Sequence, residues 1–385
     1  MTIAAAPSRV PDEPTRGVAA DGMPPLKIAM VAPPWFELPP RGYGGTEAVV
    51  AALVDGLVAR GHEVTLVAAG EHRTAATAFH RVYDEPPTER LGTPIPEVIA
   101  AAEAARAIDD AEVDVVHDHT LAGPLLARGR RQPTVVTMHG PVTGESGDYH
   151  ERLGSTVDLV AISDAQRRLN PRLNWVGTVH NAIDVPSFPF RAEKDDYVLW
   201  LGRFSPDKAP DLAIEAARRA GRRIVLAGKL NEASEFEYFD DVVRPLLGGD
   251  AEYVGEADAA LKRELLSHAR SLVFPIQWEE PFGMVMIEAM ACGTPVVAMR
   301  RGSVPEIVEH GRSGLVVDDF SRFPRALALA EELDPAEVRT EAERRFDLPV
   351  MARGYERVYR MLAEGTQSIR SLSDSGVGGA AAAAA

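Results

Sequence analysis

Short apolar runs alternate along the chain with longer segments whose apolar residues recur at helical spacing. Residues 27–31 form the first such run, and two prolines close it, which predicts a buried strand. Residues 45–60 are rich in Ala, Val and Leu and predict a helix, and residues 63–68 predict a second strand. A strand, a helix and a strand joined by short connections predict a parallel sheet.

The alternation continues to residue 179. Helices are expected near residues 95–110 and 121–128, with Ser163 or Asp164 capping a further helix. The remaining strands of this half are predicted at residues 114–117, 134–138, 159–162 and 175–179. Residues 181–190 follow neither the helical nor the strand spacing of apolar residues and contain two prolines, which predicts a linker.

The pattern restarts after the linker. Strands are predicted at residues 197–201, 223–227, 252–254, 272–274, 295–298 and 314–317, and helices at 208–220, 236–247, 257–268, 283–291 and 304–309. Three helical stretches follow, the last at residues 348–363. The chain is therefore expected to be an α/β protein with two doubly wound domains, at residues 24–185 and 190–346.

Composition narrows the class of protein. The length of 385 residues suits two domains, and a net charge of −16 argues against a general nucleic-acid binder. Cys292 is the only cysteine, so an intramolecular disulfide and a Zn–Cys cluster are excluded. No apolar run approaches the roughly 18 residues of a membrane span. Residues 1–23 lack the apolar centre of a signal peptide, so a cytoplasmic location is expected. Residues 1–23 and 366–385 are expected to be disordered.

In open parallel sheets, ligands bind beyond the carboxyl ends of the strands. Gly44 and Gly45 occupy such a position after the first strand, where glycines let the backbone approach a phosphate at a helix N-terminus. The full G-x-G-x-x-G fingerprint of an NAD site is absent. A glycine-rich turn without a ligand fits this feature equally well.

Two basic residues, Arg203 and Lys208, share the loop after the first strand of the second half. Together they could grip a diphosphate, the arginine through its fork and the lysine as a point charge. A solvated basic turn is the alternative interpretation.

The segment of residues 278–293 is the most informative. Glu280 precedes a predicted helix, and Glu288 lies inside it among Met, Val, Ile and Ala, with seven residues between the two carboxylates. A carboxylate in such an apolar helix needs a partner, and a ribose diol would provide two O–H donors. The alternative is a partly exposed glutamate at the helix edge.

Three histidines, His117, His119 and His139, follow neighbouring strands. Neutral imidazole is a common metal ligand, but this spacing matches no known zinc motif. A polar wall of a cleft is the preferred interpretation.

Taken together, residues 280–293, 201–203, Lys208, 138–140 and 181–184 resemble the retaining glycosyltransferases of the GT4 group. The resemblance covers nearly the whole body of the chain. It implies the GT-B fold, which consists of two facing Rossmann-like domains with an interdomain cleft. It also implies that the last helix, at about residues 347–364, packs back on the first domain.

The resemblance implies roles for individual residues. Glu288 would hold the nucleotide ribose, and Glu280 would hold the donor-sugar hydroxyls with the backbone amides of Phe282 and Gly283. Arg203 and Lys208 would neutralise the leaving diphosphate, with help from the Gly45 amide. His139 would face the reacting sugar. The remaining donor-site residues would be Gly44, Gly228, Lys229, Tyr253, Val254, Met284 and Val285, with Gly228–Lys229 and Tyr253–Val254 bordering the base.

The reaction expected from the resemblance is transfer of a sugar from a nucleotide sugar to a hydroxyl acceptor, with no resident cofactor. The donor favoured by similarity is UDP-glucose-like, and a GDP-mannose-like donor is the alternative. No essential metal is expected, because the sequence lacks a convincing D-x-D element. The loops at residues 35–43 and 143–150 are expected to set the acceptor, and Trp35, Phe36 and Tyr43 could stack on it or pack the loop.

Other functions on this fold remain open at this point. A sugar-nucleotide epimerase would act without an acceptor. A starch- or glycogen-synthase-like polymerase is disfavoured by the compact chain, and nothing marks the pyridoxal-phosphate lysine of a phosphorylase. A non-catalytic nucleotide-sugar-binding protein is disfavoured because Arg203, Lys208 and Glu280 are all present.

Overall fold

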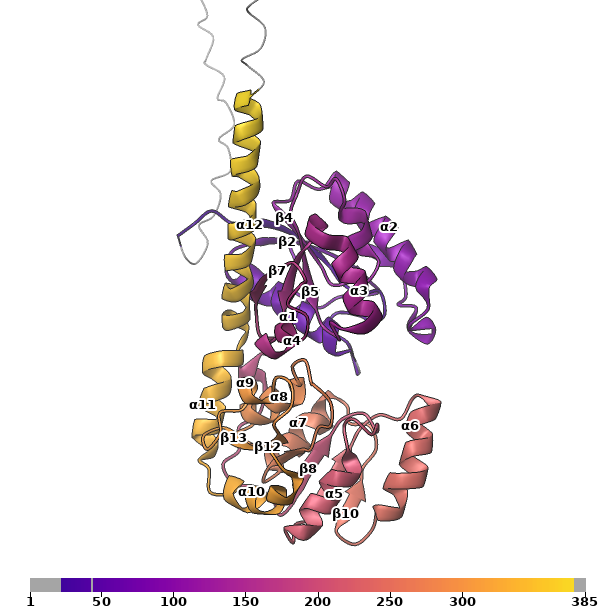
Figure 1. Ribbon diagram of the computed structural model, residues 1–385, viewed down its shortest axis with the longest axis vertical. Coiled ribbons are helices and arrows are strands. Elements are labelled where there is room, and N and C mark those ends of the chain that lie inside the picture. The colour runs from indigo at the N-terminus through magenta and orange to yellow at the C-terminus, as the bar shows by residue number, and fades with distance from the viewer. Residues whose placement is uncertain (1–21, 43, 377–385) are drawn as a thin grey trace, which may run out of the picture.

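The computed structural model describes residues 22–42 and 44–376. Its first parallel sheet has the strand order β3-β2-β1-β4-β5-β6-β7 (Figure 1). The strands are β1 (Lys27–Val31), β2 (Glu63–Ala69), β3 (Ala78–Tyr83), β4 (Val115–Asp118), β5 (Thr134–Met138), β6 (Asp158–Ala161) and β7 (Trp175–Thr178). β1, β4 and β5 are almost wholly buried, as expected for parallel strands covered on both faces.

The second sheet is also parallel, with the order β10-β9-β8-β11-β12-β13. Its strands are β8 (Val198–Leu201), β9 (Ile224–Ala227), β10 (Ala251–Tyr253), β11 (Leu272–Phe274), β12 (Val296–Met299) and β13 (Gly314–Val317). Strand order reverses between β1 and β4 in one sheet and between β8 and β11 in the other. Each reversal opens a crevice where ligands bind in folds of this class. The predicted fold class of two doubly wound α/β domains is confirmed.

Helices cover both sheets. Those of the first domain are α1 (Gly45–Ala59), α2 (Pro94–Asp110), α3 (Gly144–Leu153) and α4 (Asp164–Leu169), with a 3-10 turn η2 (Gly123–Ala127) between β4 and β5. Those that follow the linker are α5 (Pro210–Arg219), α6 (Ala233–Tyr238), α7 (Ala259–His268), α8 (Met284–Ala291), α9 (Val304–Ile307), α10 (Phe323–Ala330), α11 (Pro335–Phe346) and α12 (Leu348–Gly376).

The last helix returns to the first domain. α12 runs beside α1 (Figure 1), and its Tyr355 and Tyr359 are fully buried in the core of that domain. Glu356 on the same face is 3% exposed and accepts hydrogen bonds from Arg60 at 2.7 Å and Arg360 at 2.9 Å. Buried charges are stable only when they are paired in this way, so α12 is fastened to α1 by both packing and charge.

Several local predictions were wrong. β3 was missed because its residues are exposed or half-buried, which hides the apolar signal of a parallel strand. α3 was expected to be a loop at residues 143–150, because its sequence is polar and contains two glycines. The helix predicted at residues 236–247 begins earlier, as α6, and passes through a π turn and a 3-10 turn before Leu247. Ser163 rather than Asp164 caps α4, accepting a hydrogen bond from the Gln166 amide at 3.0 Å.

The ends of the chain differ in part from expectation. α12 continues to Gly376, so residues 366–376 are helical where the sequence suggested a disordered tail. Residues 1–21 of the predicted extension, residues 377–385 of the predicted tail and Tyr43 lie outside the described residues. No helix within the described residues is long and apolar enough to cross a membrane.

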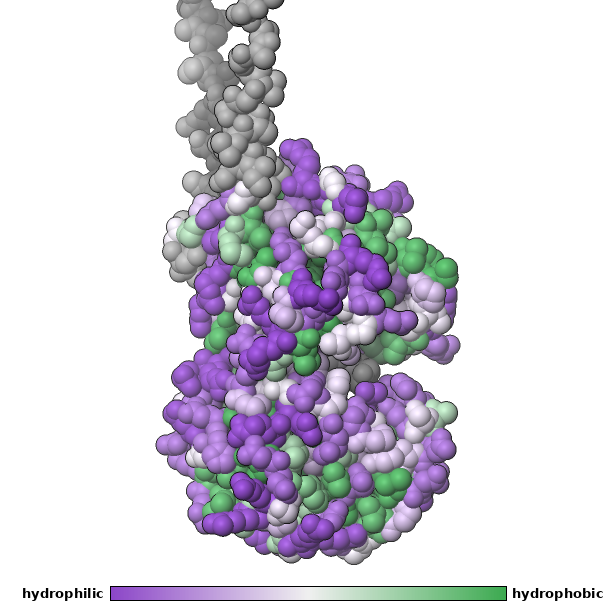
Figure 2. Space-filling view, in the orientation of Figure 1, coloured by the Kyte–Doolittle hydropathy of each residue, from purple (hydrophilic) through white to green (hydrophobic). Residues whose placement is uncertain are grey.

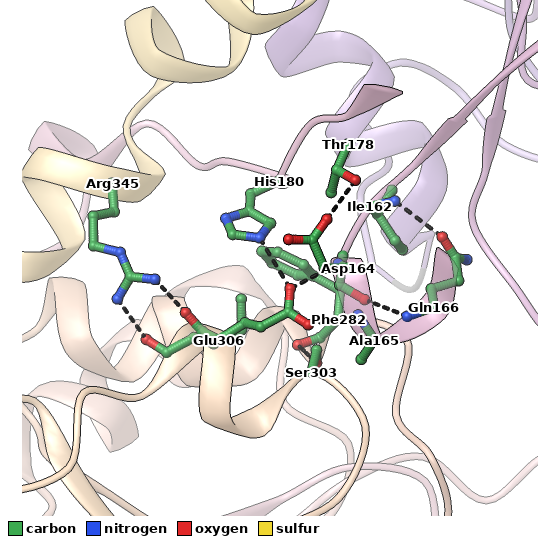
Figure 3. A network of polar contacts seen from close by, with 12 residues as sticks. Ile162, Asp164, Ala165, Gln166, Thr178, His180, Phe282, Ser303, Glu306 and Arg345 are labelled. Carbon is green, nitrogen blue, oxygen red and sulfur yellow. Dashed lines mark hydrogen bonds and ion pairs between the residues drawn. The ribbon is translucent and has the colours of Figure 1, made fainter. Parts of the chain in front are cut away.

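A polar network centred on Glu306 joins the two domains (Figure 3). Its carboxylate, on α9, accepts hydrogen bonds from the backbone amides of Asp164 at 2.7 Å and Ala165 at 2.5 Å, which begin α4 of the first domain. Burial raises the pKa of Glu306, but the hydrogen bonds from His180 and the two amides outweigh it and hold that pKa below its usual value. Glu306 is therefore an ionised cap that reaches from one domain to the helix start of the other.

Candidate active site

The main cleft lies between the two domains, where the carboxyl ends of both sheets face each other. It has a volume of about 380 Å³, and in Figure 2 the surface narrows between two lobes at this level. It is lined by Gly42, Gly44, Gly45, Ala48, Leu201, Gly202, Arg203, Lys208, Gly228, Lys229, Glu256, Ala257, Ala259, Lys262, Phe274, Glu280, Gly283, Met284, Val285 and Glu288. The first four come from the first domain and the others from the second. Both strand-order reversals contribute, through the segments that follow β1, β8 and β11.

Two helices present bare N-termini to this cleft. α1 and α8 begin after glycines, Gly44 and Gly283, and neither has a side-chain cap. Gly283 has a φ of 78°, a left-handed backbone conformation that strongly favours glycine. Uncapped helix N-termini offer backbone N–H donors and a partial positive charge to an anion.

Lys208 and Glu280 form an ion pair in the cleft. The Trp278 indole N–H donates to the same Glu280 oxygen at 3.0 Å, and the Lys208 ammonium lies 5.1 Å from the centroid of the Trp278 ring. Glu280 is 7% exposed, so the pair is largely shielded from water. The loop that holds it is fixed by Ser303, whose amide donates to the Glu280 carbonyl at 2.9 Å and whose hydroxyl donates to the Phe282 carbonyl at 2.8 Å.

Glu288 has a lysine partner that sequence reasoning missed. Lys262, on α7, donates to the Glu288 carboxylate at 2.5 Å. The available signal was the position of Lys262 one turn into a helix that Asp258 caps, accepting from Ala260 and Leu261. Nothing in the sequence predicted that this turn of α7 would contact α8. Glu288 is buried and paired, so the interpretation as an exposed helix-edge residue is wrong.

Arg203 lies in the loop after β8 and its side chain is 42% exposed. Its guanidinium is 3.5 Å from a carboxylate oxygen of Glu235, which begins a hydrogen-bond network at the start of α6. A single long contact leaves most of the fork of this arginine facing the cleft, where an anion would find it.

The residues expected to border the base divide into two groups. Gly228 and Lys229 line the cleft, and a Cβ on Gly228 would approach the Gly202 carbonyl oxygen to 1.9 Å, so only glycine fits between these loops. Tyr253 and Val254 do not line the cleft. Tyr253 instead donates to the Gly228 carbonyl at 3.0 Å and packs against Phe204 and Phe239. The next loop residues, Glu256 and Ala257, take the lining position.

Phe282 is also absent from the lining, since its side chain is 2% exposed and packs in the core. Met284 and Val285 do line the cleft, at the first turn of α8.

His139 lies in a second cavity rather than in the main cleft. This cavity, which we call the His139 cavity, has a volume of about 360 Å³ in the first domain. Gly44 and Gly45 line both spaces, so the two adjoin at the start of α1. Trp35, Phe36, Glu47, Glu97, His119, His139 and His150 are among the other residues that line it.

The three histidines lie together: the rings of His117 and His119 are in contact, with centroids 4.0 Å apart, and His119 is hydrogen-bonded to His139. His119 and His139 share a hydrogen bond of 2.8 Å between Nδ1 and Nε2, while the nitrogens of His117 bond to Tyr359 at 2.6 Å and Thr137 at 2.7 Å. Burial lowers the pKa of His139 to about 4 and lowers the pKa of both His117 and His119 well below the usual value. All three are therefore neutral at pH 7. No group of three or more metal-ligating side chains occurs in the described part of the chain.

Two carboxylic acids face the same cavity. Burial raises the pKa of Glu47 to about 7, and burial also raises the pKa of Glu97. Glu97 accepts a hydrogen bond from the Trp35 indole at 3.0 Å. The sequence analysis did not single out either residue, because each occupies an ordinary first-turn position of a helix.

Family models match both halves of this architecture. The model described as "Glycosyltransferase Family 4" matches residues 43–209, and that described as "Glycosyl transferases group 1" matches residues 186–345. The chain belongs to the group 1 glycosyltransferases. The predicted family and the predicted enzyme class are confirmed.

Named relatives of this glycosyltransferase share about a quarter of its residues. A phosphatidyl-myo-inositol mannosyltransferase of Mycolicibacterium smegmatis is 27% identical, over 88% of this chain and 94% of that protein. A D-inositol 3-phosphate glycosyltransferase of Pseudarthrobacter chlorophenolicus is 26% identical, over 83% and 89%.

Among solved structures, AviGT4, a glycosyltransferase involved in avilamycin A biosynthesis, is 29% identical with a TM-score of 0.68, over 89% of this chain and 99% of that chain. A sucrose-phosphate synthase from Thermosynechococcus elongatus is 18% identical with a TM-score of 0.71, over 88% and 100%, and shows the shared fold.

Proposed function

We propose that this enzyme transfers a hexose, with retention of configuration, from a nucleotide-sugar donor in the main cleft to a hydroxyl acceptor in the His139 cavity. One observation carries the proposal. The cations of Arg203 and Lys208, the bare N-terminus of α1 and the carboxylates Glu280 and Glu288 line one cleft. These groups match in turn the diphosphate, the sugar hydroxyls and the ribose of such a donor.

The mechanism follows from how charge moves in the reaction. The bond between the anomeric carbon and the diphosphate breaks, so negative charge grows on the leaving oxygen. Arg203, Lys208 and the amides that begin α1 would stabilise that charge, which is commonly the largest catalytic contribution. The acceptor attacks from the leaving-group face, and a phosphate oxygen can take its proton, so no protein base is required.

Lys208 and Glu280 would act together. In the structure they neutralise each other. A bound donor would place its diphosphate near Lys208 and its sugar hydroxyls near Glu280, which would replace one shared ion pair by two contacts with the substrate. His139 is neutral at pH 7 and lines the cavity that adjoins the main cleft, so it would offer a hydrogen bond to the reacting sugar without adding charge.

For the donor we propose UDP-glucose. The resemblance of residues 201–317 to glycosyltransferases with UDP-glucose-type donors supports this choice. The mannosyltransferase names of relatives at 26–27% identity favour GDP-mannose as a second candidate. The test is a thermal-shift and turnover screen of UDP-, GDP-, ADP- and dTDP-sugars. UDP-glucose should raise the melting temperature most and release UDP, and release of an isomerised sugar instead would indicate an epimerase. Stabilisation without turnover of any donor, under acceptor supplementation, would contradict the proposed reaction.

A further inference from the structure

The His139 cavity, to which the proposed function on which this inference rests assigns the acceptor, has no cationic side chain in the described part of its lining. Its lining contains no lysine or arginine among the described residues, and its histidines are neutral at pH 7. Its ionisable acids are Glu47 and Glu97. Apart from the amides that begin α1, a phosphate buried here would meet two acidic side chains and no cationic side chain of the described lining, which is unfavourable.

The Glu47 carboxylate in this cavity lacks a hydrogen-bond donor from another described residue. Its side chain is 4% exposed and lines the cavity, yet no other residue in the described part of the chain donates a hydrogen bond to its carboxylate; the only backbone donor is its own amide. A buried carboxyl group without a partner is costly unless a ligand supplies one. A hydroxyl group of an uncharged polyol would satisfy it, and Trp35 and Phe36 add the apolar walls on which sugar rings commonly pack.

The mouth of the cavity opens onto an apolar surface. Leu91 and Leu121 line the cavity and are 50% and 59% exposed, which places them at its rim. From this rim an apolar patch continues over Ile95, Val98 and Ile99 of α2 and Leu125 and Leu126 of η2, all at least 46% exposed. α2 and η2 pack against each other, and Figure 2 shows hydrophobic residues gathered over α2 at the upper right. We call these residues, with Leu121, the α2–η2 patch.

The charge of α2 disfavours an anionic membrane as the occupant of this patch. The helix carries four acidic residues and one arginine, whereas membrane-surface helices are rich in Lys and Arg. The α2–η2 patch adjoins the cavity, and exposed apolar patches of this kind often mark binding sites. This position favours, as its occupant, an apolar portion of the ligand that fills the cavity.

We propose that the acceptor is a phosphate-free amphiphile, with an uncharged hydroxyl head group bound beside Glu47 in the His139 cavity and an apolar portion lying on the α2–η2 patch.

The test compares three probes with the full-length protein: methyl β-D-glucopyranoside, its octyl counterpart below the micelle concentration, and methyl β-D-glucopyranoside 6-phosphate. Binding is followed as the part of the fluorescence change that disappears in Trp35→Phe. The octyl probe should bind at least about tenfold more tightly than the methyl probe, because seven further methylenes leave water. The phosphorylated probe should bind at least about tenfold more weakly than the methyl probe.

Variants test which residues bind the octyl chain and which bind the sugar head group. The double variant Leu125→Ser, Leu126→Ser changes two patch leucines that do not line the cavity; it should reduce the advantage of the octyl probe to within about threefold and leave the methyl probe unchanged. Leu169→Ser changes a leucine on α4 that is 45% exposed; it is the matched control and should change neither. Glu47→Gln should weaken the binding of both uncharged probes.

Several outcomes would overturn the proposal. One is equal or tighter binding of the phosphorylated probe, and another is an octyl advantage that the double variant keeps. Absence of binding by both uncharged probes would also overturn it. Sedimentation with phosphatidylcholine vesicles that the double variant abolishes, with no octyl advantage, would assign the patch to a bilayer instead. The donor screen fails or succeeds independently, so loss of the proposed function would be recognised separately.

Discussion

Two carboxylates of the main cleft are paired with lysines: Glu280 with Lys208 and Glu288 with Lys262. The chain is acidic overall, yet these lysines and Arg203 concentrate positive charge at the start of α5 and α7. Such a local excess of cations in an acidic protein is expected where an anion binds.

Arg203→Ala and Lys208→Ala should each lower kcat on the order of 100-fold, about 3 kcal/mol, because each removes one contact to the leaving diphosphate. Steady-state kinetics with the best donor measures this, and melting temperature serves as the control for folding. Arg218→Ala, at the far end of α5, is the matched variant and should retain its rate. Turnover at the native rate in both cleft variants would refute the assignment.

Glu280→Gln and Glu288→Gln should separate the two halves of the donor. Glu288→Gln should weaken both the free nucleoside diphosphate and the intact donor, because both carry the ribose. Glu280→Gln should leave diphosphate affinity nearly unchanged and depress transfer, because its partner is the donor sugar. Calorimetric titration with both ligands measures this difference. Equal loss of diphosphate binding would show instead that Glu280 shapes the loop through Trp278 and Lys208.

Glu47→Gln should change the pH dependence of stability. Burial raises the native pKa of Glu47 from 4.5 to about 7, so the native state keeps a proton that the unfolded state releases between these values. Stability of the native enzyme from this group therefore falls as pH rises through that window. The glutamine variant escapes the loss and should gain roughly 3 kcal/mol relative to the parent at pH 8, but little at pH 4.5.

Urea unfolding at the two pH values measures the gain, with the exposed Glu63→Gln as control. A gain of equal size at both pH values would contradict a titrating Glu47.

At the scale of elements, the enzyme depends on helix ends. α1 and α8 keep bare N-termini for the ligand, whereas α4, outside the cleft, receives its caps from Ser163 and from Glu306 of the other domain. Arg345, on α11, in turn donates to the backbone carbonyls of Glu306 and Ile307 (Figure 3). The polar contact between the domains is thus a helix cap: Glu306 of the second domain caps α4 of the first.

Glu306→Ala should loosen this contact and leave the nucleotide half of the cleft intact. The expected result is an increased radius of gyration in solution scattering and reduced transfer, with nucleoside diphosphate affinity unchanged because its contacts lie on the second domain. Glu309→Ala removes a nearby, half-exposed carboxylate that pairs only at 3.9–4.0 Å, and it should have no such effect. A compact Glu306→Ala enzyme with native transfer would show that packing of α12 alone holds the domains.

At the scale of the whole molecule, charge is divided between the two spaces. The lining of the main cleft contains the cations Arg203, Lys208, Lys229 and Lys262 as well as three glutamates, while the described lining of the His139 cavity has two glutamates, neutral histidines and no lysine or arginine. This division is consistent with the proposed reaction, in which a neutral hydroxyl attacks a donor and the cations of the main cleft neutralise the donor's diphosphate.

We therefore expect activity to survive removal of divalent ions, since side-chain cations and helix amides line the cleft in which we propose that the diphosphate binds. Dialysis against EDTA, followed by assay with and without Mg²⁺ or Mn²⁺, measures this. Complete loss that metal restores would show that an acidic group of the cleft, such as Glu256, binds an ion together with the donor.

The sequence alone determined the two parallel sheets and the residues that end their strands. Its information is local: apolar runs and helical periods predict strands and helices, and parallel strands bring their carboxyl ends to one edge. This reasoning singled out Arg203, Lys208, Glu280 and Glu288 as candidates. The resemblance to GT4 glycosyltransferases then identified the family. Polar or exposed elements such as β3 and α3 escaped because their burial signal is weak.

Only the tertiary structure decided which groups meet. Lys262 pairs with Glu288 across 26 residues, Tyr253 turns inward to Gly228, and His139 lies with Glu47 rather than in the donor cleft. The same holds for α12, which follows the second domain in sequence but buries Tyr355 and Tyr359 in the first. Such contacts depend on how two sheets and their loops pack in space, and pairing between distant segments has no periodic trace in the sequence. Burial, which moves the pKa of Glu47 toward neutrality, likewise arises only when that packing is complete.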